Sequence, residues 1–371
     1  MKGFQKWLCV LSILFGSLCT VKSQVMHPLP LRVAIAGVSH GHSSTVFDRK
    51  KTTDIEVVGI YEPDPVLAEV FRKQYNLEKD LFYNDLGKML SEVKPQAVVA
   101  FNSTDEHLSV VEACALKGIH VMFEKPLATS ADQVTKMEHL INANKIYILT
   151  NYETSWYPSI EKLIQLVNDS NYVGKIRKVV IRVGNDGLKK VEKYKYFFNW
   201  LTDSIKNGGG AIMDMGSYGA NIMTFLMGNQ KPISVSAVTR QFKQELYPNV
   251  DDEATIIINY PTVQCLIEAS WNWLFSKKEL EVYGDSGYLI AENDTTLHKR
   301  NLKMKSEEIK HISVRDMQII DNPFSYLKGV INGNILMPAN GLYSIGNNKL
   351  VLDILDAARL SAKSGKVIYL K

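Results

Sequence analysis

The sequence has few cysteines and no run of apolar residues long enough to anchor it permanently in a membrane. Of its four cysteines, only Cys114 and Cys265 lie beyond residue 23, and both have apolar neighbours. We therefore expect two buried free thiols rather than a disulfide framework or a thiolate metal site. No internal repeat or low-complexity segment is present, which makes a solenoid or a disordered chain a poor description.

The chain also lacks a strong excess of one charge once its first residues are set aside. Two lysines precede an apolar run from Trp7 to Cys19, and residues 21–23 offer a cleavage site before Gln24. Residues 1–23 therefore predict a secretory signal peptide, an exported periplasmic or secreted protein, and no stable membrane anchor. Loss of the three lysines in this segment takes the formal net charge from +4 to +1. Such a nearly neutral chain gives no support for a nucleic-acid partner.

From residue 31 to about 150, short β-branched or aromatic runs alternate with helical segments. This alternation predicts an α/β fold whose first domain, residues 31–150, is a doubly wound parallel sheet that binds its ligand at the carboxyl ends of the strands. The expected helices are 105–117 and 130–144, and the expected strands are 31–36, 55–61, 97–101, 120–123 and 145–150.

From residue 151 onward, longer strand candidates dominate. They predict a second domain, residues 151–371, built on a mostly antiparallel open sheet with helices on one face. An open sheet face of this kind commonly becomes a subunit interface. The expected strands are 176–183, 233–242, 254–260, 263–270, 279–283 and 288–292.

A glycine turn follows the first strand, with the sequence Gly37-Val38-Ser39-His40-Gly41-His42. Gly37 permits a tight exit from the strand, and Gly41 falls where a helix would start, so backbone N–H groups there could face a pyrophosphate. The three-glycine dinucleotide pattern is only partly present, because Ser39 and His42 stand at two of its small-residue positions. Glu62, at the end of the second strand, could accept hydrogen bonds from ribose hydroxyls and would repel a 2′-phosphate. We therefore predict NAD rather than NADP.

Two further motifs suggest chemistry. Phe123-Glu124-Lys125-Pro126 ends a strand where a nicotinamide and its substrate would meet. In the glycine-rich segment 208–218, a helix starting near Ala211 would place Asp214 and Tyr218 one turn apart on one face. A nearby Lys125 would lower the pKa of Tyr218 and make it a usable proton carrier, although the spacing also fits a buried helix in which Tyr218 merely packs.

These motifs, together with the ending 350–370, resemble the glucose–fructose oxidoreductase, inositol dehydrogenase and rhizopine-catabolism (Gfo/Idh/MocA) family over nearly all of the chain beyond residue 31. The resemblance implies a Rossmann domain, bound NAD(P), and oxidation or reduction of a sugar, polyol or related alcohol. It also implies a homodimer or homotetramer assembled through the second sheet. It implies that Lys125 contacts nicotinamide ribose and substrate, that Asp214 orients the reacting alcohol, and that Tyr218 is the acid/base, where many members have histidine.

The resemblance also implies a set of cofactor contacts. They are Gly37, Ser39, His40, Gly41, His42, Glu62, Asn102, Thr104, His107, Glu124 and Lys125. The loop that contains Asn102, Thr104 and His107 departs from the usual Thr-Pro-Asn-x-x-His pattern, but Asn102 and Thr104 can still form hydrogen bonds.

Three alternatives remain open from the sequence. His40 and His42 could suggest a metal, but no carboxylate or cysteine stands near them in the sequence, so we predict no metal site. An NAD-dependent glycosidase that works by transient oxidation would also use Glu124-Lys125-Pro126. A secreted carbohydrate-binding protein on a decayed scaffold would explain the departures at Ser39, His42 and Tyr218.

Overall fold

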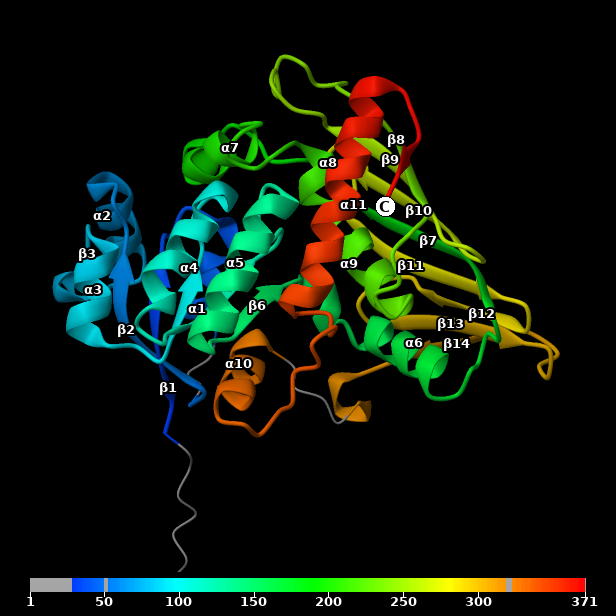
Figure 1. The fold of residues 1–371 in the computed structure, drawn as a ribbon, viewed down its shortest axis with the longest axis horizontal. Helices are drawn as coiled ribbons and strands as arrows, with labels where there is room; N and C mark the ends of the chain where they lie inside the picture. The colour runs from blue at the N-terminus through cyan, green and yellow to red at the C-terminus, as the bar shows by residue number, and fades with distance from the viewer. Residues whose placement is uncertain (1–28, 50–52, 318–321, 371) are drawn as a thin grey trace, which may run out of the picture.

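The computed structural model describes residues 29–49, 53–317 and 322–370. The segment expected to be a signal peptide, residues 1–23, lies outside the described residues. Two sheets stand side by side with helices between them and around the first sheet (Figure 1).

The first sheet has six parallel strands in the order β3-β2-β1-β4-β5-β6. Because all six run the same way, their carboxyl ends share one edge of the sheet. The predicted strands 31–36 and 55–61 are confirmed to the residue, and the others shift by one to three residues. The strands are β1 (Leu31–Ala36), β2 (Ile55–Tyr61), β3 (Phe82–Tyr83), β4 (Ala97–Ala100), β5 (His120–Glu124) and β6 (Ile148–Asn151).

Helices cover both faces of this sheet, which explains why its central strands β1, β4 and β5 are largely buried. One core contains α3 (Leu86–Val93), α4 (His107–Ala115) and α5 (Ala131–Asn144). The core on the opposite face contains residues of α1 (Ser44–Phe47), α2 (Pro65–Gln74) and α10 (Pro323–Ile331). The helix α10, from the far end of the sequence, thus completes the first sheet's packing, with Phe324 and Leu327 in its core. The predicted domain boundary at residue 150 does not account for the packing of α10 on the first sheet.

The second sheet has nine strands in the order β14-β13-β12-β11-β7-β10-β9-β8-β15. Its pairs are antiparallel except for β10 with β7. The predicted mostly antiparallel sheet is confirmed, and the sequence missed three of its strands, namely the last three in the chain. The strands are β7 (Ile176–Gly184), β8 (Ser234–Arg240), β9 (Glu253–Asn259), β10 (Gln264–Ser270), β11 (Lys277–Gly284), β12 (Gly287–Ala291), β13 (Thr296–Asn301), β14 (Glu308–His311) and β15 (Ile368–Tyr369).

Within the described residues, helices pack on only one face of the second sheet. These are α6 (Pro158–Asn168), α8 (Ala211–Asp214), α9 (Gly216–Leu226) and the long α11 (Ile345–Ser364), which stands between the two sheets (Figure 1). The inner residues of β7, such as Val179 and Ile181, are buried, whereas Arg182 on the outer face pairs with carboxylates of neighbouring strands. The short α7 (Lys195–Leu201) lies apart, near the glycine turn.

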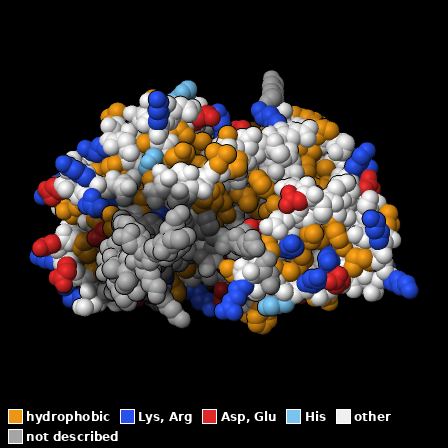
Figure 2. All heavy atoms as spheres, turned by 90° about the horizontal axis from the view of Figure 1, so that it is seen from below, with side chains coloured by type: hydrophobic (Ala, Val, Ile, Leu, Met, Phe, Trp, Pro, Cys, Tyr) orange, Lys and Arg blue, Asp and Glu red, His pale blue; other side chains and the backbone are white. Residues whose placement is uncertain are grey.

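The mixed surface charge and the two buried cysteines agree with what the composition predicts. Figure 2 shows basic and acidic side chains interspersed on the face seen from below. Cys114 and Cys265 are buried free thiols, as predicted, and burial raises the pKa of Cys114 to about 12. Among the helices that the structure describes, none combines the length and apolar character that a membrane crossing requires.

Candidate active site

Lys125 and Asp214 form a buried ion pair at the junction of the two sheets. Lys125 directly follows β5, and Asp214 ends α8. The Lys125 Nζ contacts Asp214 Oδ1 and donates a second hydrogen bond of 3.1 Å to the Asp214 carbonyl oxygen. Both side chains are at most 8% exposed. The structure thus brings together two residues that lie 89 positions apart in the sequence.

The other oxygen of Asp214 is held by a residue that the sequence did not reveal. Trp271 follows β10 and donates a hydrogen bond of 2.8 Å from its indole Nε1 to Asp214 Oδ2. With one oxygen bound to a lysine and the other to an indole, the carboxylate has little rotational freedom. The sequence could not reveal this role of Trp271, because only the folded structure brings its indole next to Asp214.

Tyr218 lies beside the same pair. The Lys125 Nζ is 4.9 Å from the centre of the Tyr218 ring, and the Lys278 Nζ is 5.3 Å from it. The expected single helix over both positions is wrong in one detail, because α8 ends at Asp214 and α9 begins at Gly216. The rotation across this junction is small, since Met215 keeps a helical backbone, and both side chains still line one cavity.

The expected lowering of the Tyr218 pKa is also wrong. Burial, followed by the nearby carboxylates of Glu153 and Asp214, raises the pKa of Tyr218 well above its usual range. The charge of Lys125 does not overcome these effects, because Asp214 is paired directly with it. Tyr218 is therefore protonated in the resting protein.

A cavity of about 270 Å³ opens over these groups. Opposite Tyr218 it contains an ion pair that the sequence did not indicate, between Lys278 of β11 and Glu153. The lining residues are His40, His42, Lys125, Glu153, Asn185, Asp186, Gly187, Leu188, Phe197, Leu201, Asp214, Met215, Tyr218, Trp271, Ser276 and Lys278.

The glycine turn adjoins this cavity at the carboxyl end of β1. Gly37 has a φ of +74°, and a Cβ there would stand 2.6 Å from the Asn102 Cβ, so only glycine fits without rearrangement. A short 3-10 helix begins at Gly41, as predicted. Ser39 lines the cavities on both sides of the turn, of about 400 and 340 Å³.

Glu62 lies where the sequence placed it, at the end of β2 beside the turn. Its carboxylate accepts hydrogen bonds of 3.0 Å from the backbone N–H groups of Val38 and Asp64. Burial raises its pKa. The side chain lines the cavity of about 340 Å³, together with Gly37 and Asn102.

The residues around this cavity fit a dinucleotide. Asn102 Oδ1 is buried and has no hydrogen-bond partner among the described residues, which leaves it able to accept a bond from a ligand. The absence of a side chain at Gly37 lets Asn102 pack directly against the turn, and Glu62 offers carboxylate oxygens to hydroxyl groups.

The buried Glu124 pairs with the half-buried His42 beside Lys125. The His42 Nδ1 is 2.9 Å from Glu124 Oε2, and Asn151 donates a 2.7 Å hydrogen bond to Glu124 Oε1. Burial opposes charge on both groups, but their mutual attraction outweighs it. The pKa of His42 is raised, and the pKa of Glu124 is lowered to about 2.

This pair corrects the assumption behind the prediction of no metal site, namely that the two histidines have no carboxylate near them. Candidate ligand atoms of His40, His42 and Glu124 lie within 4.8 Å of one another, so a carboxylate does stand near the two histidines. The pair is nevertheless satisfied internally, and His40 Nδ1 already accepts a hydrogen bond from the His42 backbone. Burial lowers the pKa of His40 well below its usual range, and its ring packs 4.5 Å from Phe197.

Two predicted cofactor contacts point elsewhere. His107 Nδ1 lies 3.0 Å from the Leu127 carbonyl oxygen, and its ring packs against Phe123 in the core. Thr104 Oγ1 contacts Asn207 at 3.4 Å. Neither residue lines the three cavities around the turn. Thr104, in the 3-10 turn Thr104–Glu106, and His107, at the start of α4, are both buried, where they support the loop that presents Asn102.

Comparison with known proteins agrees with this geometry. Residues 31–152 match the model of an oxidoreductase family with an NAD-binding Rossmann fold, and residues 160–290 match the Gfo/Idh/MocA C-terminal domain. The chain is 24% identical over 232 residues to trans-1,2-dihydrobenzene-1,2-diol dehydrogenase of Sus scrofa, covering 62% of this chain and 64% of that enzyme. The match thus spans just under two thirds of the length of that relative.

Solved structures share the fold over most of the chain. An inositol dehydrogenase homologue from Azotobacter vinelandii, complexed with NAD+, superimposes with a TM-score of 0.78 at 16% identity, covering 92% of this chain and 98% of that one. Aldose-aldose oxidoreductase from Caulobacter crescentus gives 0.76 at 18% identity, covering 92% and 100%. Since both domain models match in order and together cover most of the chain, the protein belongs to the Gfo/Idh/MocA oxidoreductase family.

Proposed function

We propose that the protein is an NAD-dependent oxidoreductase that interconverts a hydroxyl and a keto group on a sugar, a polyol or a related alcohol. The observation that carries this proposal is the convergence of Lys125, Asp214 and Tyr218 on one cavity beside the glycine turn. The names of the similar proteins, which include a diol dehydrogenase, an inositol dehydrogenase homologue and an aldose-aldose oxidoreductase, support this substrate class.

The nucleotide would be held along the carboxyl edge of the first sheet. The backbone at Gly37 and Gly41 would receive the pyrophosphate, Glu62 the adenosine ribose, and Asn102 Oδ1 a donor of the cofactor. When bound, nicotinamide supplies or accepts the hydride. Glu62 favours NAD over NADP because its carboxylate would repel a 2′-phosphate.

The protein's own part in the reaction is to position the alcohol oxygen and to move its proton. Lys125 and Asp214 provide a charged pair of fixed orientation against which that oxygen can hydrogen-bond. Tyr218 is protonated at rest, so in the reductive direction it can donate its proton to the carbonyl oxygen. This donation leaves a phenolate, which is also the form that would accept the alcohol's proton in the oxidative direction, and the nearby ammonium groups of Lys125 and Lys278 would stabilise it.

The test is a panel of aldoses, polyols and cyclic diols, assayed by absorbance of NADH with wild type, Tyr218→Phe and Lys125→Met. We expect both variants to bind NAD and to lose at least about a hundredfold in turnover. Undiminished turnover in Lys125→Met would refute the assignment. Release of free sugar from an aryl glycoside without net NADH would indicate the glycosidase instead, and failure of the wild type to bind NAD would favour the carbohydrate-binding protein.

We further propose that the chain is exported and self-associates. Residues 1–23 support export, which cell fractionation of the full-length chain would test. The outer face of the second sheet, which no described helix covers and where Val238 and Ile257 are exposed, supports a homodimer or homotetramer. Light scattering after size-exclusion chromatography would measure the mass.

A further inference from the structure

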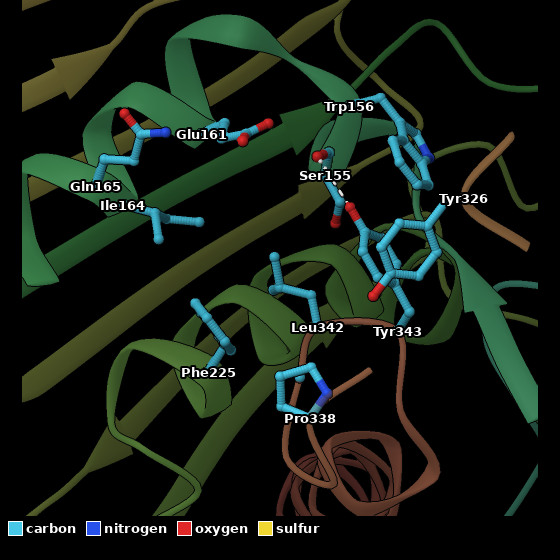
Figure 3. A pocket seen from close by; sticks show the side chains of 11 residues that line it. Ser155, Trp156, Glu161, Ile164, Gln165, Phe225, Tyr326, Pro338, Leu342 and Tyr343 are labelled. Carbon is cyan, nitrogen blue, oxygen red and sulfur yellow. Dashed lines mark hydrogen bonds between the residues drawn. The ribbon is translucent and has the colours of Figure 1, made fainter. Parts of the chain in front are cut away.

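A cavity of about 440 Å³ lies away from the candidate active site and has no role in the proposed reaction. It is bounded by α6, the end of α9, α10 and the segment before α11 (Figure 3). None of its lining residues lines the cavity that contains Lys125 and Tyr218. The lining residues are Ser155, Trp156, Glu161, Ile164, Gln165, Phe225, Tyr326, Pro338, Gly341, Leu342 and Tyr343.

One side of this cavity is an aromatic wall. The rings of Trp156 and Tyr343 are stacked, with centres 4.7 Å apart and planes 9° from parallel, and the Tyr326 ring lies 4.7 Å from Tyr343 (Figure 3). The polar ends are fixed within the protein: Trp156 Nε1 donates to Asn151 Oδ1 at 2.7 Å, and the Tyr343 hydroxyl donates to the Ser155 carbonyl oxygen at 3.3 Å. Trp156 and Tyr343 are therefore held in place and offer a ligand ring surface rather than hydrogen bonds.

Glu161, in the first turn of α6, is the cavity's charged residue. Its half-buried carboxylate has no hydrogen-bond or ion-pair partner among the described residues, and no lysine, arginine or histidine lines the cavity. Burial alone raises the pKa of Glu161 to about 7. The other titratable groups that face it are Tyr326 and Tyr343, and the ammonium of the adjacent Lys162 bonds to Gln165 Oε1 at 3.4 Å.

We propose that this cavity binds a small organic cation, with its ammonium group at Glu161 and its apolar body against Trp156 and Tyr343. Aromatic faces attract cations, and an unpaired, half-buried carboxylate gains most from a ligand that brings the missing positive charge. A sugar fits less well, since each of its hydroxyl groups needs a polar partner when it leaves water. Much of the remaining lining is apolar, supplied by Ile164, Phe225, Pro338 and Leu342, and Ser155 and Gln165 add the other polar side chains.

The probe is benzyltrimethylammonium, whose charge does not depend on pH, titrated calorimetrically into the mature protein at pH 8. Benzyl alcohol serves as the uncharged comparison. We expect one cation bound per chain, unaffected by saturating NAD, and binding at least about tenfold weaker in Glu161→Gln. The matched control is Glu112→Gln, which removes an exposed carboxylate on α4 and should bind the cation like wild type.

A second measurement needs no substitution. Protonation of Glu161 should weaken binding as the pH falls from 8 to 6, whereas the residual binding of Glu161→Gln should not change over that range. Absence of binding to wild type, equal affinity for benzyl alcohol, an unchanged affinity in Glu161→Gln, or displacement of the probe by NAD would each overturn the proposal.

Discussion

Replacement of Trp271 by phenylalanine tests whether the orientation of Asp214 controls catalysis. The substitution keeps a buried aromatic ring but removes the 2.8 Å hydrogen bond from the indole to Asp214 Oδ2. A hydrogen bond to a charged group contributes about 1.5–3 kcal/mol, which corresponds to roughly 10- to 150-fold in rate if it acts fully in the transition state. We therefore expect kcat to fall within that range while KM and NAD affinity change little, because the carboxylate loses its fixed direction but keeps its pairing with Lys125.

Steady-state kinetics on the best alcohol from the substrate panel, combined with calorimetric titration of NAD, measure this effect. The matched control is Trp273→Phe, since Trp273 is a half-buried indole two residues further on that makes no side-chain hydrogen bond among the described residues. Because Trp271 is 1% exposed, some loss of stability is also expected, about 1–3 kcal/mol, and thermal unfolding would quantify it. A kcat within about twofold of wild type in a folded Trp271→Phe protein would refute the positioning role.

Three further predictions follow from the site and the second sheet. Gly37→Ala should weaken NAD binding at least about tenfold in calorimetry, because the alanine Cβ would collide with Asn102 and the φ of this residue is +74°. An NAD affinity equal to that of wild type would contradict this reasoning. The His42–Glu124 pair should stabilise the fold most between about pH 4.5 and 6.5. Its contribution is lost as the pH falls from 4.5 towards the lowered pKa of Glu124, and as it rises through the raised pKa of His42. The difference in melting temperature between wild type and Glu124→Gln should peak in that window, and a difference independent of pH would argue against the pair. Val238→Glu should lower the mass measured by light scattering if the outer sheet face joins subunits, and an unchanged oligomer would exclude that face.

The sequence predicted the parts of the fold that depend on local patterning. The strands 31–36 and 55–61 are short apolar runs with clear ends, and β-branched residues mark them. The missed strands β13 and β14 consist mostly of polar and charged residues, and they lie next to and at the edge of the second sheet. Their pairing depends on neighbours rather than on their own composition.

In the candidate site, too, the sequence could identify some residues and not others. Lys125, Asp214 and Tyr218 stand in motifs, so a resemblance could identify them. Trp271 and Lys278 could not be found, since each contributes a single side chain brought in by a strand of the second sheet. The sequence also could not predict that the pKa of Tyr218 is raised, because the rise depends on burial and on the nearby Glu153, and both arise only on folding.

The return of α10 to the first sheet has a consequence for the order in which the chain can fold. During synthesis, residues 31–151 emerge long before residues 323–331, yet Phe324 and Leu327 complete a core that begins with Leu31 and Val33. Until those residues are made, one face of the dinucleotide domain stays partly uncovered. We therefore expect a fragment ending at residue 152 to aggregate or to bind chaperones rather than to fold alone. A nascent chain should acquire its nucleotide site only near the end of translation.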